Sequence, residues 1–191
     1  MVHLIPVNSV KHRASVRQWR ASRPVSLWWG NPAIGTAQLT TLRRISTLRL
    51  ADGGLPVGYA RWETVTPDTL TIAGLAGIPE GSIDPDITIG RSGWRGKGIG
   101  PAALTLIFDY LCATTKAPLV SLCTSVKNAV AHRAFEKADC RRIARFENET
   151  LGPCWVYGRR LDKGDLTHPL PELDRALISE HHVHEDRKQA V

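Results

Sequence analysis

The spacing of hydrophobic and polar residues predicts strands in the first half of the chain and alternating helices and strands in the second. Runs rich in β-branched residues predict strands, and apolar residues that recur every three or four positions predict helices. The predicted strands are 2–7, 45–50, 57–66, 69–73, 86–90, 118–124, 141–146 and 153–160. The predicted helices are 9–20, a long one from 99 through 111, and 128–138 with Asn128 as its N-cap. This order favours an α+β or three-layer α/β domain.

Turn residues divide these elements. Adjacent Trp28 and Trp29, followed by Gly and Pro, predict a turn rather than a helix, and a helical or irregular stretch then leads to Arg44. Asp-Gly-Gly at 52–54 predicts a hairpin between two strands. We expect a single domain over 1–161 and a polar tail over 162–191, with no internal repeat. His181, His182 and His184 in the tail could bind a metal, but a solvated terminus is favoured, and no metal site is predicted.

Composition limits the class of protein. The chain has 191 residues, of which 42% are hydrophobic, enough for one domain with a core. No apolar run approaches the roughly 20 residues of a membrane-spanning helix, and the first residues do not resemble a signal peptide, so no membrane partner is expected. The four cysteines are scattered without a CxxC pair, which indicates reduced thiols and a cytoplasmic location.

Charge is distributed unevenly along the chain. The net charge is +7; residues 1–51 hold eight Lys or Arg and no acidic residue, whereas residues 62–90 hold five acidic residues and no basic one. Such a chain could bind an anionic cofactor on one side and a cationic substrate on the other, although the charge pattern by itself favours a solvated loop for the acidic stretch. Nucleic acid is not expected as a partner, because exposed aromatics do not interleave the basic residues and no recognition-helix pattern is present.

A glycine-rich basic segment carries the clearest chemistry. Arg95-Gly96-Lys97-Gly98-Ile99-Gly100 follows a predicted strand and opens a predicted helix. Glycines let successive N–H groups point toward one site, and the helix N-terminus adds unpaired N–H groups and its positive dipole end. The spacing is neither GxxxxGK[ST] nor GxGxxG. The segment therefore predicts a pyrophosphate site of a different kind.

Two motifs resemble the GNAT superfamily of N-acetyltransferases. Arg95-x-x-Gly98-x-Gly100 is similar to its pyrophosphate motif, and Asn128-x-x-Ala131-x-Arg133-x-Phe135-Glu136-Lys137-Ala138 is similar to the helix that completes its coenzyme site. Further landmarks over residues 1–160, among them Trp28-Trp29-Gly30 and Asp86-x-x-Ile89-Gly90, look most like aminoglycoside 6′-N-acetyltransferases, although siderophore acyltransferases share parts of them. The resemblance implies a mixed, mostly antiparallel sheet flanked by helices, with acetyl-CoA as cofactor.

The resemblance also implies roles for single residues. Amides from the glycine-rich segment would hold the pyrophosphate, the strand before it would pair with the pantetheine arm, and the second motif would complete the site. The residues implied in coenzyme binding are Ile87, Ile89, Arg95, Gly96, Lys97, Gly98, Ile99, Gly100, Asn128, Ala131, Arg133, Phe135 and Lys137. Arg133 and Lys137 could equally be solvated helix charges. Phe135 replaces the usual Tyr, so the group that protonates the departing thiolate is left open, and Asp139-Cys140 replaces the usual Gly-Phe.

On the acceptor side the resemblance implies direct attack by the 6′-amine of an aminoglycoside, and hence antibiotic resistance. Asp86 would accept the proton of the amine, with Asp84 on the same strand face as second candidate. Trp28 and Trp29 would form an apolar wall, or simply pack in the core. The carboxylates expected around the polycation are Glu63, Asp84 and Asp86, with Glu80, Glu147 and Glu149 as weaker candidates. A lysine-like, siderophore or protein amine is the alternative acceptor, and an acyl-CoA-binding module is the non-enzyme alternative. The chain is expected to be a monomer or a homodimer.

Overall fold

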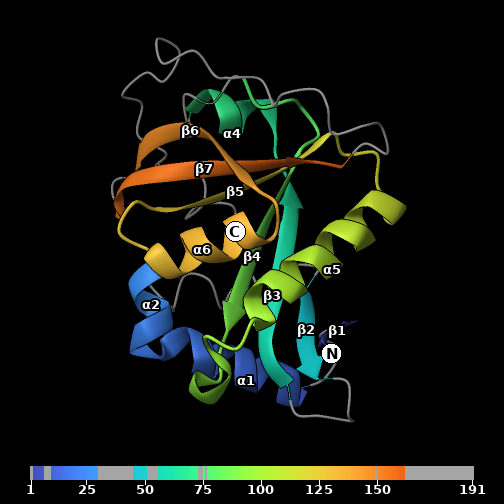
Figure 1. Cartoon of the computed structure of the whole chain (residues 1–191), viewed down its shortest axis with the longest axis vertical. Coiled ribbons are helices and arrows are strands. Elements are labelled where there is room, and N and C mark those ends of the chain that lie inside the picture. Colours follow the sequence, from blue (N-terminus) through green and yellow to red (C-terminus); the bar gives the residue numbers. More distant parts are fainter. Residues whose placement is uncertain are drawn as a thin grey trace.

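A seven-stranded mixed sheet organises the computed structural model of the chain (Figure 1). The structure describes residues 2–6, 10–29, 45–50, 56–72, 75, 77–148 and 150–161. The strand order is β1-β2-β3-β4-β5-β7-β6. The strands are β1 (Val2–Pro6), β2 (Ile45–Leu50), β3 (Pro56–Thr64), β4 (Ile83–Ile89), β5 (Leu119–Ser125), β6 (Arg141–Asn148) and β7 (Gly152–Arg160). The helices are α1 (Val10–Ala21), α2 (Arg23–Trp29), α4 (Pro67–Ile72), the 3-10 turn η1 (Ser92–Trp94), α5 (Ile99–Thr114) and α6 (Ala129–Lys137).

The sheet opens between its two central strands. Every neighbouring pair is antiparallel except β4 and β5, which run parallel and pair only at Ile83 with Val120. Beyond that point the strands diverge, so that β5, β7 and β6 cross the upper part of the molecule in Figure 1 while β2, β3 and β4 run down its lower part. Among the described strands, none pairs with the edge of β4 that faces β5 over most of its length.

Helices cover both faces of the sheet. The apolar face of α5, which includes Leu104, Ile107 and Leu111, packs with β1 and β4 in the main core. On the other face α1 packs on β3, and its Trp19 lies so close to Gly90 that a Cβ there would overlap the indole ring. The result is the three-layer α+β arrangement that the sequence predicts.

Most predicted elements are confirmed within one to three residues, but two predictions are wrong. Trp28 and Trp29 end helix α2 instead of forming a turn, and residues 67–72 form helix α4 instead of a strand. In α4, Pro67 occupies the first position and Asp68 the first turn, where the fixed φ of Pro and the charge of Asp favour a helix. Strand β4 begins at Ile83, three residues before the predicted start, and therefore includes Asp84.

Some predictions lie outside the described residues. These are the turn from Gly30 to Pro32, the stretch leading to Arg44, the Asp-Gly-Gly link and the tail with its three histidines. All four cysteines, which do lie within them, are free thiols. In the described part of the chain, no helix has both the length and the apolar character needed to cross a membrane.

Candidate active site

A cleft of about 1020 Å³ opens where β4 and β5 diverge. We call its two sides the coenzyme wall and the acceptor wall. The coenzyme wall consists of lining residues from the end of β4, the turn before α5, and α6: Ile87, Ile89, Arg95, Gly96, Gly98, Gly100, Asn128, Ala131, Arg133, Ala134, Phe135 and Lys137. The acceptor wall consists of lining residues from α1, α2, β3 and the middle of β4: Arg20, Pro24, Val25, Trp28, Arg61, Pro85, Asp86 and Thr88.

The glycine-rich turn presents backbone amides to the cleft. Gly96 and Gly98 have φ values of +73° and +76°, in the left-handed region that favours glycine. Among the described residues, no N–H from Gly96 to Gly100 donates to another main-chain carbonyl or side chain. A Cβ at Gly96 or Gly98 would meet no protein atom within 4 Å, so open space lies beside these amides. The N-terminus of α5 at Ile99 adds its positive dipole end. The turn thus fits a pyrophosphate group.

The two charged side chains of this turn are already engaged. Arg95 donates from Nε to the carbonyl oxygen of Ile89 at 2.9 Å and from Nη2 to that of Gly90 at 3.0 Å. Its guanidinium therefore ties the turn to the end of β4. The Lys97 ammonium lies 5.0 Å from the ring centroid of Trp94. Neither Lys97 nor the buried Ile99 side chain lines the cleft, so the roles left to these two residues are those of their backbone N–H groups.

Helix α6 closes the coenzyme wall. Asn128 caps it as predicted, because Oδ1 accepts from the N–H of Ala131 at 3.2 Å while Nδ2 donates to Thr124 Oγ1 on β5 at 3.0 Å. These bonds fix the helix start against the strand. Phe135 is 6% exposed and meets the Tyr157 ring edge-on, so it serves as an apolar part of the wall. Arg133 and Lys137 line the cleft and are exposed, so both add positive charge beside it.

Asp86, the predicted base, lies in the cleft with Arg61 beside it. The two residues face each other across β3 and β4, and Arg61 reaches the same oxygen, Oδ2, from Nε at 2.7 Å and from Nη2 at 2.6 Å. The side chains are 25% and 15% exposed. The neighbouring carboxylate raises the pKa of Arg61 above its usual value. Asp86 is therefore one half of a charge-assisted pair rather than an isolated carboxylate.

The other predicted carboxylates do not join Asp86. Asp84 is buried and Glu63 exposed, opposite each other on β4 and β3, and neither lines the cleft. Glu80 and Glu147 are exposed and do not line it either. Glu149 and the Trp29 side chain lie outside the described residues, whereas Trp28 lines the cleft. Among the described lining residues, the expected ring of carboxylates is thus reduced to Asp86.

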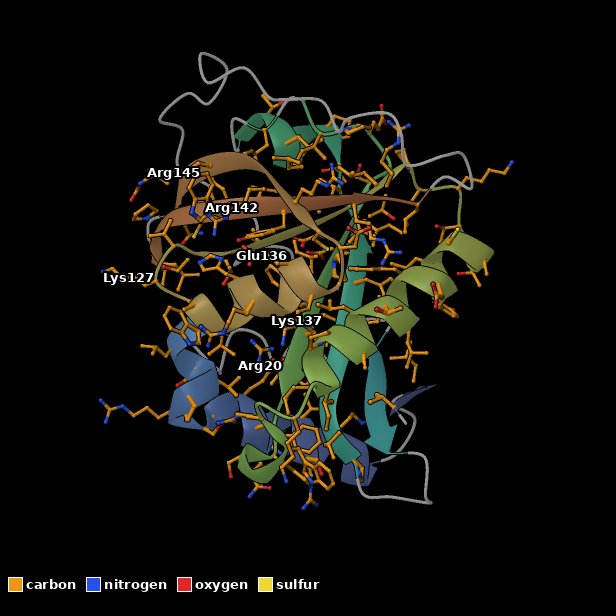
Figure 2. The ribbon with its side chains drawn as sticks, viewed as in Figure 1. Arg20, Lys127, Glu136, Lys137, Arg142 and Arg145 are labelled. Atoms are coloured by element: carbon orange, nitrogen blue, oxygen red, sulfur yellow. The ribbon has the colours of Figure 1, made fainter. Side chains whose placement is uncertain are left out.

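Sequence reasoning missed the arginines of the acceptor wall. Arg20 comes from the end of α1 and Arg61 from β3, and both face the cleft in the folded chain. The nearest signal for Arg20 was the count of eight basic and no acidic residues in 1–51, which does not show which of them turn inward, and Arg61 lies outside that stretch. Figure 2 shows the Arg20 side chain between α1 and α6.

A second polar cluster, also missed, lies behind α6. Tyr157 Oη accepts from Arg142 Nε at 2.7 Å and lies 3.0 Å from His132 Nδ1, while His132 Nε2 lies 3.2 Å from the carbonyl oxygen of Val126. Arg142 also contacts Glu136 at 3.3 Å. Figure 2 places Arg142 and Glu136 above α6 and Arg20 below it, so this cluster braces the helix from the side away from the cleft.

The chain is similar to known acetyltransferases. Residues 9–148 match the family described as acetyltransferase (GNAT) domain. No curated protein sequence matches the chain. Among solved structures, the aminoglycoside acetyltransferase AAC(6′)-Ib in complex with paromomycin and acetyl-CoA superposes with a TM-score of 0.65 at 19% identity, over 83% of this chain and 93% of that one.

Two further solved structures share this fold. An aminoglycoside N(6′)-acetyltransferase from Legionella pneumophila gives a TM-score of 0.63 at 14% identity, over 84% and 92% of the two chains. A GNAT-family acetyltransferase from Bacillus anthracis gives 0.64 at 11% identity, over 84% and 93%. Identities this low show a common fold, and the family match covers most of the described chain. The protein belongs to the GNAT family of acetyltransferases.

Proposed function

We propose that this protein transfers the acetyl group of acetyl-CoA to a primary amine that enters the cleft beside Asp86. One observation carries the proposal: the amides of the glycine-rich turn and the carboxylate of Asp86 open into the same cleft. A phosphate-binding turn alone would suit many ligands. Combined with a carboxylate on the strand that leads into the turn, it suits a reaction between an anionic coenzyme and a protonated amine.

The coenzyme wall would hold acetyl-CoA. Amides from Gly96 to Gly100 would donate to its pyrophosphate, and the free edge of β4 around Ile87 and Ile89 would pair with its pantetheine arm. Arg133 and Lys137 would add positive charge. When bound, acetyl-CoA supplies an acyl carbon activated as a thioester. Cytoplasmic location, as predicted from the cysteines, belongs to this proposal.

The acceptor wall would orient the amine and take its proton. An ammonium is not a nucleophile, so the acceptor must lose a proton, which Asp86 can accept directly or through water. Arg61 holds Asp86 in place but also offsets its charge, which lowers its strength as a base. Phe135 has no proton to donate, so coenzyme A would leave as its thiolate and then take a proton from water. A thiol pKa near 8.5 makes the thiolate a tolerable leaving group.

Two acceptor classes compete. The 6′-amine of aminoglycosides is supported by the sequence landmarks and by the ligands named for AAC(6′)-Ib. The second class is an amine on a smaller molecule of the lysine-like or siderophore kind. It is supported by the small number of carboxylates: among the described lining residues only Asp86 is anionic, whereas a polycation is best held by several carboxylates.

The test is acetyl-CoA consumption with kanamycin, tobramycin, lysine and a basic peptide. Asp86→Asn should lower kcat by about 10²- to 10⁴-fold while the coenzyme affinity stays unchanged. Asp109→Asn, at an exposed position of α5 outside the cleft lining, is the matched control and should behave as wild type. Wild-type kcat in Asp86→Asn would remove Asp86 from the reaction. Coenzyme binding without transfer to any amine would instead support the acyl-CoA-binding module.

A further inference from the structure

Trp94 is an exposed aromatic residue at the edge of the coenzyme wall. It ends the 3-10 turn η1, two residues before Gly96, and it lines the same cleft as the glycine-rich turn. Trp94 is 36% exposed, whereas Trp19 and Trp62 are only 8% and 6% exposed. An indole ring left in water forgoes the burial of a large apolar surface. A ring in this state that borders a binding cleft is therefore suited to contact a ligand.

Two arginines hold the segment that carries this ring. Arg91, before η1, donates from its N–H and from Nε to two carbonyl oxygens at the start of β3, at 3.1 and 2.8 Å. Arg95, after η1, donates to two carbonyl oxygens at the end of β4, at 2.9 and 3.0 Å. The N–H of Trp94 itself donates to the carbonyl oxygen of Arg91 at 3.1 Å. The backbone that presents the ring is thus tied to both strands and pre-organised for binding.

The indole ring is restrained but not enclosed. The Lys97 ammonium lies over the ring, 5.0 Å from its centroid, and such a contact between a cation and an aromatic face limits how the ring can turn. The ring still lines the cleft, beside backbone amides of the glycine-rich turn. A flat apolar surface therefore lies next to a turn that fits a pyrophosphate group.

The position of Trp94 suits the nucleotide end of coenzyme A. In this coenzyme the diphosphate joins the pantetheine arm to an adenosine. The arm would follow β4 back into the molecule, whereas the segment between β4 and α5 extends past the lower end of β4 in Figure 1. The Cα atoms of Trp94 and Gly96 are at most about 7 Å apart, because two residues separate them. A base linked to the diphosphate through one ribose can therefore reach the ring.

We propose that Trp94 stacks on the adenine base of coenzyme A, so that the acyl donor is a free acyl-coenzyme A and not a phosphopantetheine arm that lacks the nucleotide. This inference rests on the proposed coenzyme site. Bases stack on aromatic side chains through their π-faces, without the need for a hydrogen bond. The other described aromatic residues of the cleft lining come from α2, α6 and β6 and not from the segment beside the turn: Trp28, Phe135 and Phe146.

The experiment compares two ligands that differ by the adenosine. 3′-Dephospho-coenzyme A carries the arm, the diphosphate and the adenosine, whereas pantetheine 4′-diphosphate ends at the diphosphate. Calorimetry with the full chain measures both dissociation constants. Trp94→Ala should raise the dissociation constant of 3′-dephospho-coenzyme A by about 5- to 100-fold, the range for stacking one base on one ring, and should leave that of pantetheine 4′-diphosphate unchanged. Trp94→Phe keeps an aromatic ring and should retain most of the difference between the ligands.

Tyr110→Ala is the matched control. Tyr110 is also an exposed aromatic residue, at 47%, but it lies on α5 outside the cleft lining, so its loss should change the affinity for neither ligand. Tryptophan fluorescence gives a second measurement on the unaltered chain. 3′-Dephospho-coenzyme A should quench part of the wild-type emission through the stacked base, pantetheine 4′-diphosphate should not, and Trp94→Phe should lose this quenching. Thermal unfolding checks that each variant folds.

The outcomes separate this inference from the proposed function. Equal weakening of both ligands in Trp94→Ala would assign the ring to the shape of the turn and overturn the inference, as would an unchanged affinity for both. Neither result touches acetyl transfer. If Trp94→Ala does not fold, the quenching comparison between the wild type and Trp94→Phe decides. If the wild type binds neither ligand, the coenzyme site and this inference both fail. Stacking on Trp94 without acetylation of any amine would refute the acetyltransferase proposal alone.

Discussion

Replacing Gly98 by Ala tests the turn on which the coenzyme wall depends. Gly98 is the N-cap of α5 and has φ +76°, a conformation that costs an L-residue roughly 1–2 kcal/mol. Its added Cβ would meet no protein atom within 4 Å, so backbone strain is the only cost within the described protein. Gly93 in η1 is the matched control, because its Cβ also meets nothing and its φ is not in the left-handed region.

The strain must appear in one of two measurements. If Gly98→Ala keeps the turn, the free energy of unfolding should fall by about 1–2 kcal/mol relative to Gly93→Ala, measured by urea titration. If the turn relaxes to relieve the strain, stability is retained, but the amides move and coenzyme A must restore them. Its dissociation constant should then rise by about 5- to 30-fold, measured by calorimetry.

The quantity to test is therefore the loss in free energy of unfolding added to the loss in free energy of coenzyme A binding. This sum should reach about 1–2 kcal/mol for Gly98→Ala, and more if the Cβ also obstructs the pyrophosphate. Gly93→Ala should leave the coenzyme affinity at the wild-type value. If both variants match the wild type in stability and affinity, the glycine-rich turn does not hold the coenzyme through its backbone.

Three further predictions concern the scaffold. Gly90→Ala should lower the free energy of unfolding by about 1–3 kcal/mol in urea titration, because the added methyl group overlaps the Trp19 ring. Tyr157→Phe should cost about 1–3 kcal/mol in the same assay through the lost bonds to Arg142 and His132, with coenzyme affinity unchanged. Burial raises the pKa of the Cys140 thiol from 9.0 to about 12, so the folded state keeps a proton that the unfolded state loses above pH 9. The free energy of unfolding, measured by urea titration, should then fall by about 1 kcal/mol from pH 9 to 10. The fall should be smaller in Cys140→Ala, which lacks the thiol.

Elements with strong local patterns could be predicted from the sequence, and elements without them could not. Helix α6 was located because Asn128 caps it and its apolar residues recur at helical spacing. Helix α2 was missed because two adjacent tryptophans before Gly and Pro were interpreted as a turn, whereas those two residues only mark where the helix ends. The β-branched composition of α4 favoured a strand. A helix forms instead because Pro67 and Asp68 suit a helix N-terminus, and because Leu70 packs in a second hydrophobic core with Leu119 and Phe146.

The same distinction applies to the site. The glycine-rich turn is one contiguous segment whose chemistry lies in its own backbone, so the order of glycines between β4 and α5 sufficed to predict a turn that would fit a pyrophosphate. The pairing of Arg61 with Asp86 joins residues 25 positions apart and depends on the register of β3 and β4. No local pattern contains that register. The acidic window was expected to surround a cation, but only Asp86 lines the cleft. Asp84 and Glu63 share its sheet face but lie farther along β4 and β3, outside the cleft lining, and Glu80 follows helix α4.

Proteins that share this fold can keep a site made of backbone groups while changing a site made of side chains. Backbone amides keep their positions wherever the chain path is kept, and a TM-score of 0.65 at 19% identity shows that this chain shares its fold with AAC(6′)-Ib. The acceptor wall is made of side chains from α1, α2, β3 and β4, and any of these can change without moving the backbone. Here the side chains contribute two arginines and one aspartate. The charge of the acceptor must therefore be inferred from this wall and not from the ligands of proteins that share the fold.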